Sequence, residues 1–166
     1  EALLPEKDAG AAASRLAAAK AAEVAGRRPD DWILAADTLV FCDGAILAKP
    51  DGVVSAAEML ARLSGREHRV VTAVRLRRGG DPGREELCWS SVRFGAMSRE
   101  EIAWYVGTGE PLDKAGAYGI QGLGSRFIEE IRGSYTNVMG LPARAVYRLM
   151  RGAGDPALAS LALSSP

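Results

Sequence analysis

The sequence has few of the residues that build disulfide or metal sites. It contains two cysteines, Cys42 and Cys88, and one histidine, His68. The cysteines lack the spacing of a metal-binding motif, so we expect reduced, half-buried strand residues. His68 precedes a predicted strand and is expected on the surface rather than as a ligand. These counts argue against a disulfide-stabilised or zinc-binding protein.

An excess of one charge and a long apolar run are absent as well. The chain has 21 basic and 21 acidic residues, so its formal net charge is zero. Any polyanion must therefore be bound by a local cluster of charges. No apolar run approaches the length of a membrane span, and no signal-peptide pattern opens the sequence. We expect a cytoplasmic protein with no membrane partner, and we do not expect it to bind nucleic acid.

Lysine is scarce, since the chain has 4 lysines against 17 arginines. Three of the four, Lys20, Lys49 and Lys114, stand in unusual contexts, and a lysine is a compact point charge that does not substitute for the planar arginine fork. Lys20 shares one stripe of a predicted helix with Leu16 and Val24, so it interrupts an apolar face. The alternative is a lysine whose stem packs while its charge reaches water.

The order of the predicted elements indicates one α/β domain over residues 1–152, followed by a frayed tail over residues 153–166. The length and the 48% hydrophobic content are those of an ordinary globular domain. Two capping-box patterns, at residues 55–58 and 98–101, predict helix starts. The other expected elements are a helix over residues 10–25, a hairpin turn at Asp43-Gly44, strands over residues 69–77, 85–94 and 127–131, and a last helix from Pro142.

Asp37 lies inside the apolar run of residues 32–41, where a strand favours Val or Ile. A buried, unpaired carboxylate is costly, so Asp37 needs a cation, a metal ion or several hydrogen-bond donors. Lys49, near the far end of the predicted hairpin, is the expected cation neighbour.

Residues 108–124 break the pattern of regular elements. Five glycines lie here among Asp113, Lys114 and Gln121. Such glycines let the backbone approach a ligand closely. The segment is neither a Walker loop nor a dinucleotide fingerprint, so by itself it indicates only a possible ligand site.

Together these segments resemble the Maf family of nucleotide pyrophosphatases. The match is collinear from Glu1 to about Arg151, and its longest block is specific. The matching motifs are ADTLV at 36–40, AKP at 48–50, LSGR at 63–66, TAV at 72–74, GTGEP at 107–111, DKAGAYGIQG at 113–122 and GSYTNVMGLP at 133–142.

The resemblance implies an α/β fold of two lobes, related to the inosine triphosphate pyrophosphatases, with a mixed β-sheet flanked by helices and a central cleft. It also implies a homodimer and hydrolysis of a nucleoside triphosphate at the α-phosphorus with Mg²⁺ or Mn²⁺. By position, the resemblance implies Asp37 as catalytic acid-base and metal-associated carboxylate, Glu1 as an acidic metal-site residue, Lys49 as the phosphate-contacting lysine and Lys20 as the lysine of the first helix. Thr38 and Gln121 match positions associated with the choice of base. We expect Lys20 and Lys114 to bind the substrate as well.

Such chemistry suits these residue types. Cleavage of a triphosphate needs charge neutralisation on the leaving pyrophosphate and a water directed at phosphorus. Asp37 either takes the proton of that water or holds the metal ion, and the sequence leaves both roles open. Gln121 either reads the base or braces its loop.

Three functions remain open at this point. Asp37-Thr38 and the motif IQG at 120–122 resemble the group that acts on dTTP and UTP. The alternatives are a relative that acts on a methylated guanosine triphosphate and a nucleotide-binding regulator of cell division without catalysis. The family also has a first strand and a Ser/Arg-rich phosphate loop that nothing in this sequence matches. We expect a chain without that loop to fold but to hydrolyse nucleotides poorly, unless the polypeptide is longer than this sequence.

Overall fold

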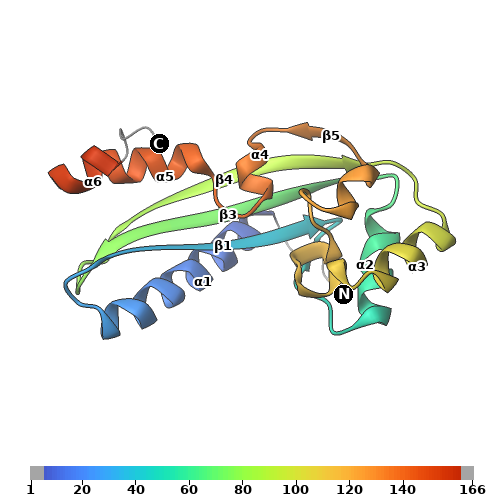
Figure 1. Cartoon of the computed structure of the whole chain (residues 1–166), viewed down its shortest axis with the longest axis horizontal. Helices are drawn as coiled ribbons and strands as arrows, with labels where there is room; N and C mark the ends of the chain where they lie inside the picture. The colour runs from blue at the N-terminus through green and yellow to red at the C-terminus, as the bar shows by residue number, and fades with distance from the viewer. Residues whose placement is uncertain (1–5, 162–166) are drawn as a thin grey trace.

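A five-stranded sheet with the order β2-β1-β3-β4-β5 forms the centre of the molecule. The computed structural model describes residues 6–161. All four strand pairings within that range are antiparallel, so the sheet is antiparallel. The mixed sheet that the family resemblance implies is therefore wrong. The α/β class, with a sheet flanked by helices, is confirmed (Figure 1). The strands are β1 (Trp32–Cys42), β2 (Ala45–Leu47), β3 (Glu67–Arg78), β4 (Arg84–Phe94) and β5 (Ile128–Arg132).

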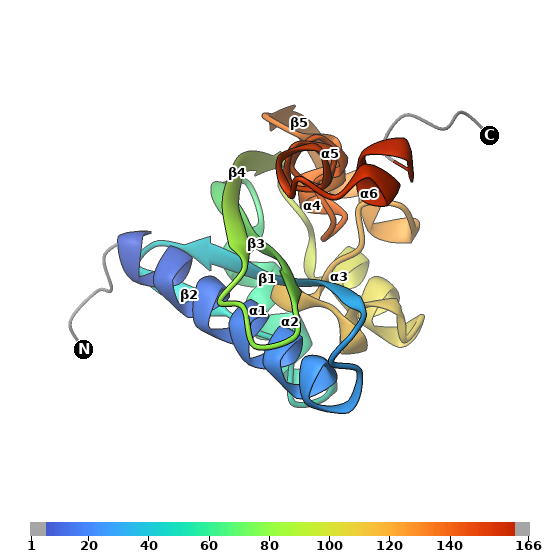
Figure 2. The ribbon, with the colours of Figure 1, turned by 90° about the vertical axis from the view of Figure 1, so that its left-hand side faces the viewer.

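Helix α1 (Glu6–Arg27) lies along one face of the sheet, against β1 and β3 (Figures 1 and 2). Its buried face is a row of alanines at every fourth position, Ala9, Ala13, Ala17, Ala21 and Ala25. Methyl side chains let the helix axis come close to the strands. The predicted apolar stripe is therefore wrong, because Leu16 and Val24 are 44% and 42% exposed.

The opposite face of the sheet is covered by helices from the C-terminal part of the chain (Figure 2). These are α4 (Tyr135–Val138), α5 (Ala143–Gly152) and α6 (Pro156–Leu161). Leu149 and Leu158 pack with Val74 and Leu76 of β3. Helix α6 differs from the frayed tail that the sequence predicts. Its start is held because Asp155 accepts hydrogen bonds from the Trp32 indole and from the N–H of Ala157.

One end of the sheet carries a separate group of helices and turns (Figure 1). It comprises α2 (Val53–Leu63), α3 (Arg99–Gly107) and the 3-10 turns η1 (Glu110–Asp113), η2 (Ala115–Ala117) and η3 (Leu123–Phe127). The largest buried cluster lies here and includes Leu60, Val70, Phe94 and Tyr105. No helix within residues 6–161 is both long and apolar enough to cross a bilayer.

Local turn and capping patterns were predicted with mixed success. Asp43-Gly44 forms the β1–β2 turn with positive φ at both residues, and Ser98 with Glu101 forms a complete capping box at α3. The pattern at residues 55–58 is not a cap. Helix α2 begins at Val53 after Gly52, so that segment lies inside the helix.

The cysteines and the histidine differ in how well their burial was predicted. Cys42 and Cys88 are free thiols on strands, as expected, and Cys42 is fully buried. His68 is 2% exposed, which contradicts the surface position expected from the sequence. Its Nε2 lies 2.8 Å from Tyr118 Oη, and its ring contacts Phe94 edge-on at 5.1 Å. Burial lowers the pKa of His68 from 6.5 to about 4.

The depressed pKa of His68 predicts a loss of stability in mild acid. The pKa of His68 is 6.5 in the unfolded chain and about 4 in the folded chain. Between these pH values the unfolded chain binds a proton that the folded chain does not bind, so the unfolded state is favoured as the pH falls. Between about pH 7 and about pH 5 we expect the wild type to lose about 2 kcal/mol more unfolding free energy than His68→Gln. Urea unfolding at both pH values measures this. Because His68 is the single histidine, equal losses in the two proteins would contradict the burial argument.

Candidate active site

A cleft opens along the edge of β1, just beyond the point where β2 ends. Strand β2 pairs with β1 only at Val40, Phe41 and Cys42, so the preceding part of β1 has no neighbour on that side among the described residues. The cleft has a volume of about 370 Å³. Its lining includes every predicted site residue within residues 6–161, namely Lys20, Asp37, Thr38, Lys49, Lys114 and Gln121. Glu1, the second predicted metal ligand, lies outside the described residues.

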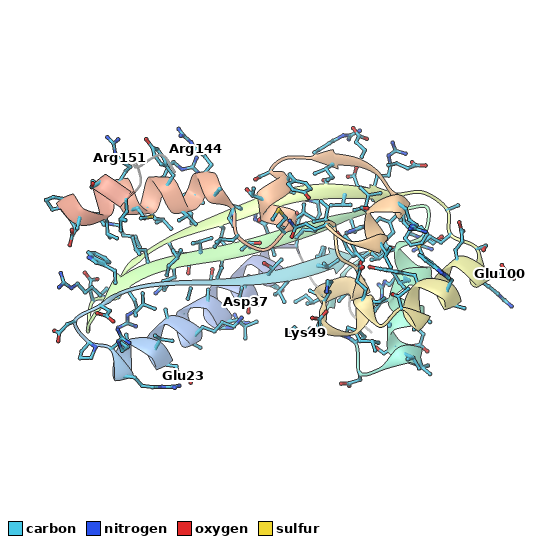
Figure 3. All side chains as sticks on the ribbon, viewed as in Figure 1. Glu23, Asp37, Lys49, Glu100, Arg144 and Arg151 are labelled. Atoms are coloured by element: carbon cyan, nitrogen blue, oxygen red, sulfur yellow. The ribbon has the colours of Figure 1, made fainter. Side chains whose placement is uncertain are left out.

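Five parts of the fold supply most of the lining. Lys20 comes from α1, and Asp37 and Thr38 come from β1. Lys49 follows β2, and residues 114–122 lie between η1 and η3. Residues 138–140, at the end of α4, complete the wall. Figure 3 shows Asp37 in the space between β1 and α1, with Lys49 near the turns at the end of the sheet.

The cation that pairs with Asp37 is Lys20. The Lys20 Nζ lies 2.5 Å from Asp37 Oδ1 and 3.5 Å from the carbonyl oxygen of Ala36. Alternate residues of β1 face α1, as Leu39 does, which directs Asp37 toward the helix. The Asp37 side chain is only 12% exposed, whereas that of Lys20 is 57% exposed. The expected pairing of Asp37 with Lys49 is therefore wrong.

Thr38 points to the opposite face of the sheet and offers an acceptor to the cleft. Its Oγ1 lies 2.9 Å from Thr72 Oγ1 and 3.5 Å from the carbonyl oxygen of Gly140. Thr72 already donates its proton to the carbonyl oxygen of Asn137, at 3.1 Å. The Thr38 hydroxyl must then donate to Thr72 or to Gly140. A hydroxyl has one proton and two lone pairs, so in this arrangement Thr38 keeps a lone pair available to a ligand.

The other two lysines stand on the far side of the cleft. Lys114 Nζ binds Asp113 Oδ1 at 2.6 Å, and this hydrogen bond and charge, with a smaller contribution from Lys49, lower the pKa of Asp113. Lys49 forms no ion pair within residues 6–161. Gly116 fixes the segment that carries Lys114, since its N–H donates to the carbonyl oxygen of Ala48. Its φ of +68° and a Cβ position within 3.0 Å of Val40 exclude other residues there.

The Gln121 side chain is exposed at the cleft and has no hydrogen-bond partner in the part of the chain that the structure describes. A residue that braced its loop would bond to neighbouring backbone. In the described residues the side chain makes no such bond, and its amide is available to a ligand as both donor and acceptor.

Sequence reasoning missed the apolar wall of the cleft. Tyr118, Val138 and Met139 line it together with the charged groups. The motifs at 113–122 and 133–142 contain these residues, but nothing in their type or spacing distinguishes a cleft wall from an ordinary core. A lining that combines charged and apolar side chains suits a ligand that joins phosphates to a ring.

The described residues fit a metal ion that is shared with a ligand. They contain no cluster of three or more His, Cys, Asp or Glu side chains. Asp37 is the one carboxylate that lines the cleft, and one of its oxygens contacts Lys20. Mg²⁺ is commonly held by one or two carboxylates together with substrate phosphates and water. Asp37 suits that arrangement and could not hold an ion alone.

Comparison with known proteins identifies the family. The model of the Maf-like protein family matches residues 1–153. The chain belongs to the Maf family. It is 49% identical over 144 residues to the "dTTP/UTP pyrophosphatase" of Symbiobacterium thermophilum, an alignment that covers 86% of this chain and 73% of that protein. It is 50% identical to the protein of the same name from Anaeromyxobacter dehalogenans, over 82% of this chain and 72% of that protein.

A third Maf relative extends this agreement. The "dTTP/UTP pyrophosphatase" of Methylococcus capsulatus is 48% identical over 153 residues, covering 92% of this chain and 75% of that protein. At this level of identity the sheet, the cleft and the order of its motifs are expected to be shared.

The lysines of the cleft predict binding of a polyphosphate. Replacing Lys49 by Met should weaken binding of inorganic tripolyphosphate at least about tenfold, because a charge-assisted hydrogen bond contributes roughly 1.5–3 kcal/mol. Isothermal titration calorimetry at constant ionic strength measures the affinity. Arg15→Met, which removes an exposed charge from α1 outside the cleft, is the matched control. Equal affinities for the two variants would show that Lys49 does not contact phosphate.

Proposed function

We propose that this protein hydrolyses dTTP and UTP to the nucleoside monophosphate and pyrophosphate. The observation that carries the proposal is the convergence on one cleft of three lysines, a largely buried carboxylate and an amide without a partner in the described residues. The three relatives named above support the choice of substrates.

The phosphate end of the substrate would lie among the lysines. In the reaction a water oxygen forms a bond to the α-phosphorus, and the bond from that phosphorus to the bridging oxygen breaks. Pyrophosphate leaves with the extra negative charge, which Lys49 and Lys114 neutralise. Their flexible stems allow the ammonium groups to follow the departing group.

Asp37 would act on the attacking water. A bound Mg²⁺ or Mn²⁺ would supply charge neutralisation at the phosphates and help to orient this water. The Asp37 oxygen that does not contact Lys20 either takes the proton of the water or holds the ion. Lys20 orients the carboxylate at 2.5 Å, so its role is to fix Asp37 as well as to attract the anion.

The base end would be read by Thr38 and Gln121. Thymine and uracil carry one ring N–H donor between two carbonyl acceptors. Thr38 presents an acceptor, and the Gln121 amide supplies a donor, which complements that pattern. Cytosine has an acceptor at the ring nitrogen and leaves the Thr38 oxygen unpaired, which costs binding energy.

The homodimer and the cytoplasmic location belong to the same proposal. The first rests on the family resemblance, and the second on two free cysteines and on the lack, within residues 6–161, of a helix that could span a membrane. Size-exclusion chromatography with light scattering tests the dimer, and fractionation of cells tests the location.

Replacing Asp37 by Asn tests the catalytic role. General-base and metal roles contribute on the order of 10²–10⁴ in rate, so pyrophosphate release should fall by about that factor. The fold should persist, since Asn keeps the size of the side chain. Asp30→Asn, on an exposed carboxylate in the turn before β1, should keep full activity. Turnover by Asp37→Asn within a few-fold of wild type would refute the assignment.

A panel of nucleotides tests the choice of base. With added Mg²⁺, the specificity constants for dTTP and UTP should exceed those for CTP, ATP and GTP by roughly tenfold to a hundredfold, because a mismatched base leaves a buried polar group unpaired. A preference for a methylated guanosine triphosphate would replace the substrate and keep the reaction. Tight binding of nucleotides without pyrophosphate release would instead support the regulator. The intact mass of the protein should be confirmed in the same preparation.

A further inference from the structure

The loop that carries Gln121 is hydrogen-bonded to two side chains of the α3–η1 region. Tyr105 lies on α3 and Glu110 begins η1. The Tyr105 hydroxyl donates to Glu110 Oε1 at 2.8 Å and accepts from the N–H of Gly119 at 3.1 Å. The second Glu110 oxygen, Oε2, accepts from the N–H of Leu123 at 2.8 Å. Three consecutive hydrogen bonds therefore connect the two ends of the loop.

Glu110 also accepts a hydrogen bond from Gly124, whose N–H lies 3.1 Å from Oε1. The fixed backbone groups are thus at residues 119, 123 and 124, and Gln121 lies between them. Burial alone would raise the pKa of Glu110, but the hydrogen bonds from Leu123, Gly124 and Tyr105 outweigh it and lower that pKa. Hydrogen bonds to an ionised acceptor are shorter and stronger than neutral ones, so the carboxylate is a firm anchor.

The closeness of this contact requires glycine at the loop. A Cβ on Gly122 would overlap the Glu110 carboxylate, and a Cβ on Gly119 would come within 2.8 Å of Lys114 Cε. The backbone of residues 119–122 therefore lies directly on the Glu110 and Lys114 side chains. In this arrangement Ile120 is buried at 7% exposure, and the adjacent Gln121 is exposed at the cleft.

We infer that Glu110 is a positioning residue that fixes residues 119–124, and through them Gln121, so that the cleft selects its nucleotide. This inference rests on the proposed function for its substrate. Glu110 does not line the cleft and touches no reacting atom. It acts by removing conformations of the loop in which the Gln121 amide would miss the base. Preorganisation of this kind raises affinity and selectivity without a new contact to the ligand.

The test compares Glu110→Ala with Glu110→Gln. Glu110→Ala removes every acceptor, and we expect the KM for dTTP and UTP to rise about tenfold or more, with a smaller change in kcat. The preference for UTP over CTP should fall by a similar factor, since a loose loop reads both bases poorly. Glu110→Gln keeps one acceptor oxygen and should recover part of both losses. Binding of inorganic tripolyphosphate should be no weaker in either variant, because the lysines remain.

The matched control is Glu100→Ala. Glu100 is an exposed carboxylate at the outer end of α3, directed away from the cleft (Figure 3). Kinetic constants equal to those of wild type are expected. An unchanged ratio of UTP to CTP specificity constants in Glu110→Ala would overturn the inference, as would a loss confined to kcat. If Glu110→Ala does not fold, Tyr105→Phe serves in its place, because it removes the hydroxyl that joins Glu110 to Gly119.

A measurement without substrate separates this inference from the proposed function. In Glu110→Gln, amide hydrogen exchange at Leu123 and Gly124 should be about tenfold faster than in Glu100→Ala, because an ionised acceptor has been lost. Equal exchange in the two variants would overturn the anchoring role. If the wild type releases pyrophosphate from no nucleotide, the proposed function fails, and the exchange rates alone then decide whether Glu110 fixes the loop.

Discussion

The cleft depends on how early the pairing between β1 and β2 ends. Strand β2 pairs with β1 only from Val40 to Cys42 and then turns away, so among the described residues the part of β1 before Val40 has one side open. An open strand edge lets neighbouring residues of opposite faces reach the same space, which a central strand would not allow. Asp37 can therefore approach α1 while Thr38 approaches α4. The departing chain brings Lys49 to the same opening, and its link to Gly116 places Lys114 beside it.

Lysine and arginine occupy different places in this protein, although the chain has no net excess of positive charge. Three of the four lysines line the cleft, while ion pairs elsewhere are formed by arginine, such as Arg148 with Glu86 and Arg75 with Glu85. Arginine suits fixed, bidentate ion pairs with carboxylates at the surface. Lysine suits a cleft in which the charge must follow a changing anion. A chain with zero net charge can thus present a local cationic site.

Most local patterns predicted local structure, the capping pattern at residues 55–58 excepted. The errors in burial came from contacts between distant segments. The Ser98 box, the Asp43 turn and the long strands follow from neighbouring residues. That α1 buries alanines and exposes Leu16 could not be predicted from neighbouring residues, because it depends on how closely a helix can approach its sheet. The burial of His68 could not be predicted for a related reason, since its hydrogen-bond partner Tyr118 is fifty positions away in the sequence. The site residues came from motif resemblance, whereas the pairing of Lys20 with Asp37 needed the fold.

The cleft is assembled from parts of the chain that are remote in sequence, from Lys20 on α1 to Gly140 after α4. No short segment contains it, so occupancy of the cleft reports that α1, the sheet and the segments after it have folded together. A ligand that binds only the folded chain stabilises it by about 2.7 kcal/mol when its concentration is a hundred times its Kd. The nucleotide supply of the cell would then set the resistance of this protein to proteolysis, as well as the demand for its activity.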